Sequence, residues 1–190
     1  GILPKDQIIP GEKLEMGSSI KVYVSKLEIG PKGPFIMLSR THYGFLKRLL
    51  EIEIPELSDG TVMIYSVARE AGNRSKIAVY TEYTNVDPIG AVIGEKGRRI
   101  ANILKELKGE KIDVILYDKD PIKFITNALS PAKDVKVTIK DEAKKEALAL
   151  VDDKNLSLAI GKKGQNVKLA SRLTHYKIEV KSEDSLANQV

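Results

Sequence analysis

The sequence contains no cysteine and no tryptophan, and only 5% of its 190 residues are aromatic. The lack of cysteine excludes disulfides, thiolate zinc sites and cysteine nucleophiles, and it agrees with a reducing cytosol. The shortage of aromatic side chains leaves few rings on which a ligand can stack. Shape and backbone contacts must therefore contribute more to binding than stacking does.

Long apolar runs are also absent. No run approaches the ~20 residues that are needed to cross a bilayer, and the first residues, GILPKDQ, lack the basic-then-apolar order of a signal peptide. We therefore expect a soluble, cytoplasmic protein that does not enter a membrane. Because the first residue is not methionine, we also expect the chain to be a fragment.

Signatures of catalysis and of metal binding are scarce. The two histidines, His42 and His175, lie far apart, each beside a tyrosine and without a second ligand at a suitable spacing. Two acidic pairs, at 118 with 120 and at 152 with 153, lie at predicted element boundaries, where aspartate commonly turns or caps a chain. No nucleophile and base pairing, Walker loop or Rossmann fingerprint is visible. We predict no enzyme activity, no metal and no cofactor.

The charge balance is basic, with 31 lysine and arginine residues against 26 aspartate and glutamate residues, a formal net charge of +5 at pH 7. This excess is modest for a protein that binds nucleic acid. The distribution of the charge is therefore more informative than its sum.

A pair of glycines three residues apart occurs twice, in IGEKGRRIANILKELKGEKIDV from Ile93 and in IGKKGQNVKLASRLTHYKIEV from Ile160. The residues around the first pair predict a helix from Thr41 as its N-cap to Pro55, strands at 61–70 and 76–83, a short helix at 85–94, the glycine turn, a helix and a strand ending near 117. The second copy predicts the same order: a helix after Pro121, strands at 134–141 and 146–153, a short helix at 155–161, the turn, a helix at 165–174 and a strand at 177–180. The sequence therefore contains an internal repeat of a whole supersecondary unit.

The segment that joins the two copies, DKDP, is so short that we expect the units to dock against each other. Before the repeat, 20–29 and the stretch from Pro34 predict two strands around the turn GPKGP. The sequence KELKGEK near the end of the first repeat mixes lysine with glutamate, which favours a solvated helix end.

A glycine turn between two helices suits an anionic ligand. Without β-carbons the turn is tight and a ligand can approach the peptide plane closely. The helix that follows directs unpaired N–H groups and its positive dipole end outward, where a phosphate is favourable. A single such turn is more often a plain helix end, but two copies in the same frame, both with lysine in the turn, argue against that interpretation.

The predicted binding residues are the isoleucine before each turn, the turn itself and the charged or amide side chains that follow it. In the first copy they are Ile93, Gly94, Glu95, Lys96, Gly97, Arg98 and Arg99. In the second they are Ile160, Gly161, Lys162, Lys163, Gly164, Gln165, Asn166 and Lys168. The second turn is the more cationic, because Glu95 opposes an anion at the first. We expect Gln165 and Asn166 to donate hydrogen bonds to phosphate or sugar.

The repeated unit resembles the type II KH domain, whose Gly-x-x-Gly loop clamps the backbone of about four nucleotides of RNA. The segments IMLSRTHYGFLKRL, NRSKIAV, VDPIGAVIGEKGRRI, ELKGEKIDV and LSLAIGKKGQNVKLASRLT are similar to those of the NusA family of bacterial transcription factors. The resemblance runs through nearly the whole chain. It implies an α+β fold: the C-terminal part of an all-β OB-fold barrel at 1–41, a first KH domain at 42–118, a second at 119–184 and a tail at 185–190.

The same resemblance implies that the protein binds nascent single-stranded RNA and modulates transcription elongation, pausing, termination and antitermination. It also implies RNA polymerase and other transcription factors as partners, through regions that are largely absent here, and we expect a monomer. The family's first loop is often Gly-Glu-Gly-Gly, whereas this chain has Lys96 at the third position. The alternatives are a ribosome-associated KH protein that binds rRNA, an RNA-degrading phosphorylase, whose KH and OB parts come in the opposite order, and a fragment that mainly contacts proteins through its barrel.

Overall fold

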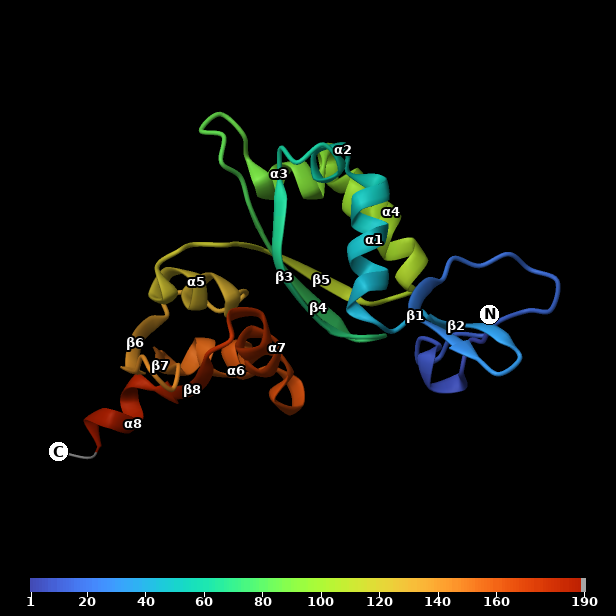
Figure 1. The fold of residues 1–190 in the computed structure, drawn as a ribbon. Helices are drawn as coiled ribbons and strands as arrows, with labels where there is room; N and C mark the ends of the chain where they lie inside the picture. The colour runs from blue at the N-terminus through green and yellow to red at the C-terminus, as the bar shows by residue number, and fades with distance from the viewer. Residues whose placement is uncertain (189–190) are drawn as a thin grey trace.

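The computed structural model of the chain describes residues 1–188. Its N-terminal part consists of a short 3-10 helix (Lys5–Gln7) and an antiparallel hairpin of β1 (Tyr23–Gly30) and β2 (Gly33–Ser39) (Figure 1). Ile2 forms a parallel bridge to Met37 beside this hairpin. The predicted hairpin is confirmed, although β1 begins at Tyr23 rather than at 20. The OB barrel stays a prediction.

The first repeat follows the hairpin and has the predicted order of elements. They are α1 (Tyr43–Glu53), α2 (Pro55–Ser58), β3 (Met63–Glu70), β4 (Arg74–Tyr80), α3 (Pro88–Ile93), α4 (Arg98–Leu107) and β5 (Lys111–Leu116). The strands form a sheet of order β3-β4-β5, in which β4 pairs antiparallel with β3 and parallel with β5. Strand β5 is therefore an edge strand.

The second repeat has the same topology. Its elements are α5 (Pro121–Ala128), β6 (Lys136–Asp141), β7 (Glu146–Val151), α6 (Asp153–Ile160), α7 (Gln165–Thr174) and β8 (Lys177–Ser182). The sheet has the order β6-β7-β8, with β7 antiparallel to β6 and parallel to β8. The internal repeat predicted from the glycine turns is confirmed as an α+β unit that occurs twice.

Some local predictions need correction. The N-cap of α1 is His42, whose Nδ1 accepts a hydrogen bond of 2.9 Å from the Gly44 amide, whereas the Thr41 hydroxyl bonds to Gln7. Pro55 not only stops α1 but opens α2, because proline fits the first helical position. A further helix, α8 (Glu183–Ala187), follows β8 where a tail was expected.

Strand β4 is buried on both faces and belongs to two cores. Ile77 and Val79 pack with the buried residues of α1, α3 and α4, whereas Ala78 points to the opposite face. There it joins a core with Leu169 and Leu173 of α7. Figure 1 shows α1 and α4 on one side of the β3-β4-β5 sheet and α7 of the second repeat on the other. The two repeats therefore share a hydrophobic core, which confirms the docking that the short connection predicted.

Polar contacts reinforce this interface. The Ser66 hydroxyl donates a hydrogen bond of 2.8 Å to the Leu173 carbonyl. Lys76 of β4 is fully buried, and its Nζ lies 2.8 Å from both Asp113 Oδ2 and the carbonyl of Ser130 in the second repeat. Burial lowers the pKa of Lys76. Burial alone would raise the pKa of Asp113, but hydrogen bonds from Arg74 and Lys76 outweigh it and hold that pKa below its ordinary value.

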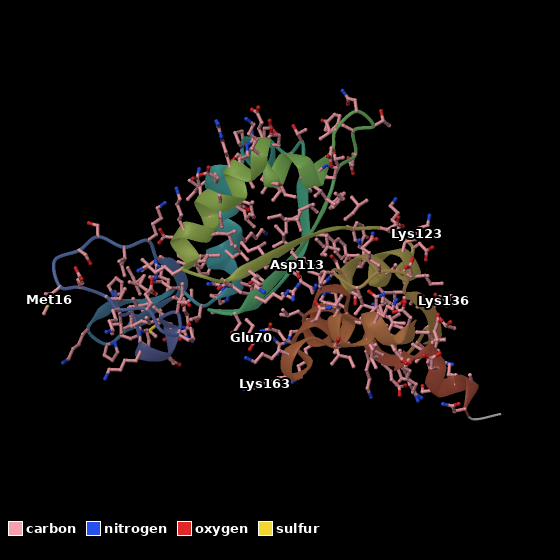
Figure 2. The ribbon with its side chains drawn as sticks, turned by 180° about the vertical axis from the view of Figure 1, so that it is seen from behind. Met16, Glu70, Asp113, Lys123, Lys136 and Lys163 are labelled. Atoms are coloured by element: carbon pink, nitrogen blue, oxygen red, sulfur yellow. The ribbon has the colours of Figure 1, made fainter. Side chains whose placement is uncertain are left out.

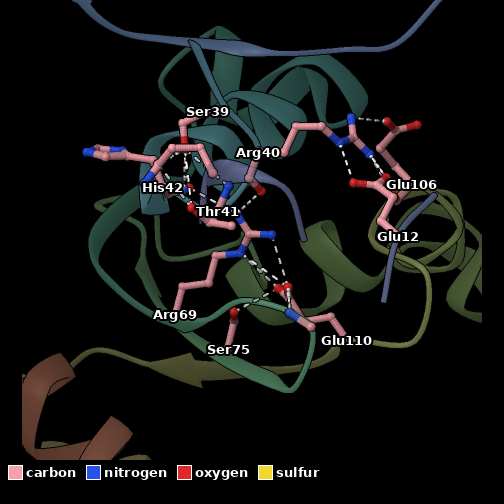
Figure 3. A network of polar contacts seen from close by, with 11 residues as sticks. Glu12, Ser39, Arg40, Thr41, His42, Arg69, Ser75, Glu106 and Glu110 are labelled. Carbon is pink, nitrogen blue, oxygen red and sulfur yellow. Dashed lines mark hydrogen bonds and ion pairs between the residues drawn. The ribbon is translucent and has the colours of Figure 1, made fainter. Parts of the chain in front are cut away.

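Two buried arginines tie the N-terminal part to the first repeat (Figure 3). Arg40 pairs with Glu12 at 2.5 Å and with Glu106 at 3.0 Å. Arg69 donates to the Arg40 carbonyl at 2.8 Å and pairs with Glu110 at 3.0 Å. Glu110 also accepts hydrogen bonds from the Ser75 hydroxyl and the Gly72 amide. The interpretation of KELKGEK as a solvated helix end was therefore wrong for Glu110, which is buried, whereas Glu106 pairs with Arg40 and stays partly exposed.

Breaking the pair of Arg69 and Glu110 will destabilise the fold. The two side chains are 1% and 0% exposed, so Arg69→Ala leaves an uncompensated buried carboxylate. We expect the free energy of unfolding in urea to fall by about 3–5 kcal/mol. The control is Arg48→Ala, which removes an ion pair to Glu51 from an arginine that is 63% exposed and costs less than about 1 kcal/mol. Equal losses in the two variants would contradict a structural role for the buried pair.

Candidate nucleic-acid interface

The two glycine turns have nearly the same backbone conformation. Gly94 and Gly161 have φ, ψ of 79°, 171° and 77°, 171°, and Gly97 and Gly164 have 70°, 17° and 74°, 13°. In both copies the first glycine ends the preceding helix, and its amide donates a 2.9 Å hydrogen bond back into that helix. The helix after the turn then begins directly. The repeat therefore extends to the torsion angles of the candidate site.

The first glycine of each turn is required by conformation and by space. A positive φ with ψ near 180° is a region that essentially only glycine occupies. A Cβ on Gly161 would lie 2.7 Å from the backbone nitrogen of Asn166, and one on Gly94 would lie 2.7 Å from the Arg99 side chain. The clash at Gly161 is with backbone and the clash at Gly94 is with a side chain that is able to move. The second turn is thus the less tolerant of substitution.

The third residue of each turn is a lysine in the left-handed region, Lys96 with φ 52° and Lys163 with φ 55°. Glycine adopts this conformation freely, whereas a side chain costs about 1–2 kcal/mol. Both lysines are exposed, so the strained backbone presents a positive charge to solvent at the tip of each turn.

Two predicted binding residues hold the turns from behind. The Asn166 side chain is fully buried, and its Nδ2 donates to the carbonyls of Leu129 at 3.1 Å and Ala159 at 3.0 Å. The prediction that this amide donates to phosphate or sugar was therefore wrong. Arg99, at the equivalent position of the first turn, donates to the Ala91 carbonyl at 2.8 Å and pairs with Glu56 at 2.6 Å. Both side chains fix the angle between the two helices.

The remaining cations face solvent. Within residues 1–188, no ion pair within 4 Å engages the exposed basic side chains of the two turns, which are Lys96, Arg98, Lys162, Lys163 and Lys168. Glu95 is exposed beside Lys96 and lowers the positive potential of the first turn. Ile93 and Ile160 are half-buried in front of the turns. Helices α4 and α7 begin at Arg98 and Gln165, whose own amides donate back to the carbonyls of Glu95 and Lys162. The positive dipole end of each helix adds to the field at the turn.

A groove of about 590 Å³ runs beside the edge strand β5. Ile89 of α3 and the strand residues Val114, Ile115 and Leu116 form its apolar wall. The opposite side belongs to the second repeat, from Thr126 and Asn127 to Asp134. No motif in the sequence indicates this contribution, because it depends on how the two repeats dock.

A smaller cleft of about 320 Å³ separates the second turn from the β3–β4 turn of the first repeat. Lys162, Lys163 and Lys168 line one side, and Glu70 lies on the other. Gln165 Nε2 donates a 2.9 Å hydrogen bond to Glu70 Oε2 across the cleft. Figure 2 shows Glu70 close to Lys163. This carboxylate competes for the same cations that an incoming phosphate would meet.

Other kinds of site find little support among the residues that the structure describes. Residues 1–188 contain no group of three histidine, aspartate or glutamate side chains placed to hold a metal ion. No helix in this part is both long and apolar enough to span a bilayer. Asp120 and Asp152 cap α5 and α6 through hydrogen bonds to Ile122 and Asn155, as their positions predicted.

Comparison with known proteins identifies the two repeats. Residues 40–117 match the model of the NusA-like first KH domain, and residues 121–188 match that of the NusA-like second KH domain. The chain belongs to the NusA family. Proteins named transcription termination/antitermination protein NusA from Bacillus subtilis and Thermus thermophilus are 52% identical over 182 residues and 50% identical over 176 residues. These matches cover 96% and 93% of this chain.

The chain spans about half the length of the NusA relatives, 49% of the Bacillus subtilis protein and 45% of that of Thermus thermophilus. The crystal structure of APE1850 has a TM-score of 0.52 and 24% identity, with 71% of this chain and 96% of that chain covered. At this identity the likeness concerns the fold alone. Both repeats are thus NusA-type KH domains in sequence, and tandem α+β units in structure.

Substitution of the first glycine in the second KH domain will show how far the turn depends on it. We expect Gly161→Ala to lower the free energy of unfolding by about 2–3 kcal/mol. Alanine would be strained in this backbone conformation, and its Cβ would clash with the Asn166 backbone. Gly164→Ala has room for its Cβ and costs only about 1–2 kcal/mol for the left-handed conformation. Urea unfolding measures both. A larger loss for Gly164→Ala would contradict the described geometry.

Proposed function

We propose that both KH domains bind one extended single-stranded RNA, and that the chain is the RNA-reading part of a transcription elongation, termination and antitermination factor. The observation that supports this most strongly is the pair of glycine turns with the same backbone, exposed cations and a helix that begins directly after each turn. RNA polymerase and other transcription factors are the proposed partners of the longer protein. We place it, as a monomer, in the cytoplasm, where nascent transcripts emerge.

Each turn binds phosphate by two means. The positive dipole ends of α4 and α7 favour an anion at the turns, and the exposed lysines, which have no ion pair among the described residues, supply charge beside them. The proposed contact residues in the first domain are Ile93, Gly94, Glu95, Lys96, Gly97 and Arg98. In the second they are Ile160, Gly161, Lys162, Lys163, Gly164, Gln165 and Lys168. Arg99 and Asn166 position the two turns from behind.

Bases lie in the grooves beside the edge strands. Strands β5 and β8 are each paired on one side only, so their outer edges present backbone groups to bases, apart from the Leu116 carbonyl, which accepts from Asn127. Few aromatic side chains are present, and the apolar walls therefore replace stacking platforms. We further propose that the hairpin of β1 and β2 within 1–41 is the C-terminal part of an OB barrel, followed by KH domains at 42–118 and 119–184.

A ribosome-associated role on rRNA is the main alternative. It is disfavoured, because the relatives that match 96% of this chain carry the name of a transcription protein. Affinity purification of the full-length protein from its host separates the two. Recovery of RNA polymerase with nascent transcripts supports the proposal, whereas recovery of ribosomal subunits without polymerase contradicts it.

Charge reversal at the second turn should remove most RNA binding. If four to six phosphates are neutralised, the slope of log affinity against log salt is about −3 to −4 for single-stranded RNA. In Lys162→Asp/Lys163→Asp we expect the affinity to fall at least about tenfold and the slope to weaken by about 1.4. Fluorescence anisotropy with an unstructured RNA measures both quantities.

The matched control is Lys140→Asp/Lys144→Asp, which makes the same charge change at exposed lysines on the β6–β7 hairpin. It should change affinity only about twofold at 0.15 M salt, where separated surface charges are screened. All variants should keep the circular dichroism spectrum of the native chain. An unaltered affinity in the first variant, or equal losses in both, would count against the clamp.

Neutralising Glu70 should strengthen binding. This carboxylate holds Gln165 and faces three lysines across the cleft, so Glu70→Gln removes a negative charge beside the proposed phosphate. We expect a two- to fivefold gain in affinity at low salt that shrinks as salt is raised, since about 0.5–1 kcal/mol is typical of exposed charge pairs. Glu142→Gln, on the exposed β6–β7 turn, is the control with little expected change. A loss of affinity in Glu70→Gln is the contrary result.

A further inference from the structure

Residues 130–134 of the second KH domain form a wall of the groove that belongs to the first. Ser130, Ala132, Lys133 and Asp134 face the same cavity as Ile89 of α3 and the strand β5. Figure 1 shows the end of α5 and the segment after it next to β5. This groove is therefore composite: neither KH domain alone supplies all of its walls.

The wall is held in place by hydrogen bonds to three different elements. The carbonyl of Ser130 accepts from the buried Lys76 Nζ at 2.8 Å, and Asn127 Nδ2 donates to the Leu116 carbonyl at 3.1 Å. The amide of Lys133 donates to Asn155 Oδ1 of α6 at 3.0 Å. The segment is thus fixed to β4, to β5 and to the helix that leads into the second turn.

Ala132 anchors the wall from the inside. Its side chain is 9% exposed and packs with Val151 and Ala159 of the second domain. Lys133 and Asp134, the two residues that follow this anchor, are exposed. Their polar groups therefore stand at the rim of the cavity, on a segment that is fixed at both ends.

The chemistry of the cavity fits one nucleobase and its phosphate. The volume of about 590 Å³ lies within the usual range for a bound small molecule. Its floor is apolar, from Ile89 and the β5 residues Val114 to Leu116, and it suits the face of a base. At the rim, Lys133 offers a cation and Asp134 a carboxylate. A carboxylate accepts hydrogen bonds but donates none, so it matches a base that carries an exocyclic amino group.

We propose that residues 130–134 complete a base pocket of the first KH groove, in which Lys133 contacts the backbone phosphate and Asp134 selects an amino-bearing base over uracil. This inference rests on the proposed RNA binding and deepens it. It assigns sequence preference to a segment outside both glycine turns, and it places that segment between the two grooves. The RNA passes from one KH domain to the other along this wall.

The absence of cysteine allows a direct test. Lys133→Cys, Lys162→Cys and Lys140→Cys each give the chain a single thiol for a photo-crosslinking label. Each labelled chain is irradiated with a pool of random-sequence single-stranded RNA, and the crosslinked nucleotides are sequenced. Crosslinking from position 162 tests the proposed function, and crosslinking from position 133 tests the pocket. Crosslinking from position 140 measures the background of non-specific encounters.

We expect strong crosslinking from 133 and 162 and weak crosslinking from 140, with uridine depleted about fivefold or more at or beside the nucleotide reached from 133. Asp134→Asn, added to Lys133→Cys, should reduce this depletion to less than about twofold, because the amide also donates hydrogen bonds. Asp134 has φ 54°, a conformation that asparagine tolerates well, so this variant keeps the fold.

Two results overturn the inference while the proposed function stands. One is crosslinking from 162 with no more from 133 than from 140. The other is crosslinking from 133 without depletion of uridine, or with a depletion that Asp134→Asn leaves unchanged. If position 162 fails to crosslink as well and the native chain does not bind the pool, the proposed function fails and the pocket fails with it.

Discussion

The double burial of strand β4 is the constraint on which the arrangement of this chain depends. Alternate residues of one strand serve two cores, Ile77 and Val79 toward the helices of the first KH domain and Ala78 toward α7 of the second. Small residues on the second side let α7 approach the sheet closely. Lys76 then adds a buried cation whose partners come from both domains. Rotation of one domain would uncover apolar surface and leave that charge without acceptors.

The two glycine turns share a backbone but differ in electrostatics. At the first, Glu95 stands beside Lys96 and Arg98, whereas the second has Lys162, Lys163 and Lys168 without an acidic residue in the turn. The structure shows that the second turn nonetheless has an acidic neighbour, Glu70, which comes from the other domain. At each turn one carboxylate therefore lowers the positive potential. At the first turn it is Glu95 of the turn itself, and at the second it is Glu70, which the docking of the two domains places there.

The sequence was sufficient to predict whatever depends on local pattern. Apolar periodicity and turn residues predicted the order of elements in both repeats, and the two glycine pairs located the turns to the residue. It was insufficient where long-range packing decides. Asn166 looked like an exposed donor, because nothing in its neighbours reveals that its amide reaches Leu129 and Ala159. Glu110 was predicted to be solvated because it lies in a lysine-rich stretch. In the structure it is buried in an ion pair with Arg69, which lies 41 residues earlier in the chain.

The composite groove has the same origin. Its far wall lies on residues that have no motif of their own, and only docking brings them to β5. The short connection DKDP indicated that the domains dock, but not which faces meet. The buried lysine at position 76 also carried no signal, since a lysine in a strand normally lies at the surface.

The fixed contact between the KH domains has a consequence for how the chain discriminates among ligands. Once an RNA is bound at one glycine turn, its effective concentration at the other turn is high only if the nucleotides between the two turns are unpaired and span the distance. A transcript that folds into a hairpin between the two points gains no avidity. Under the RNA binding proposed above, the two domains favour RNA that is unpaired over the distance between the turns, and the packing of strand β4 sets that distance.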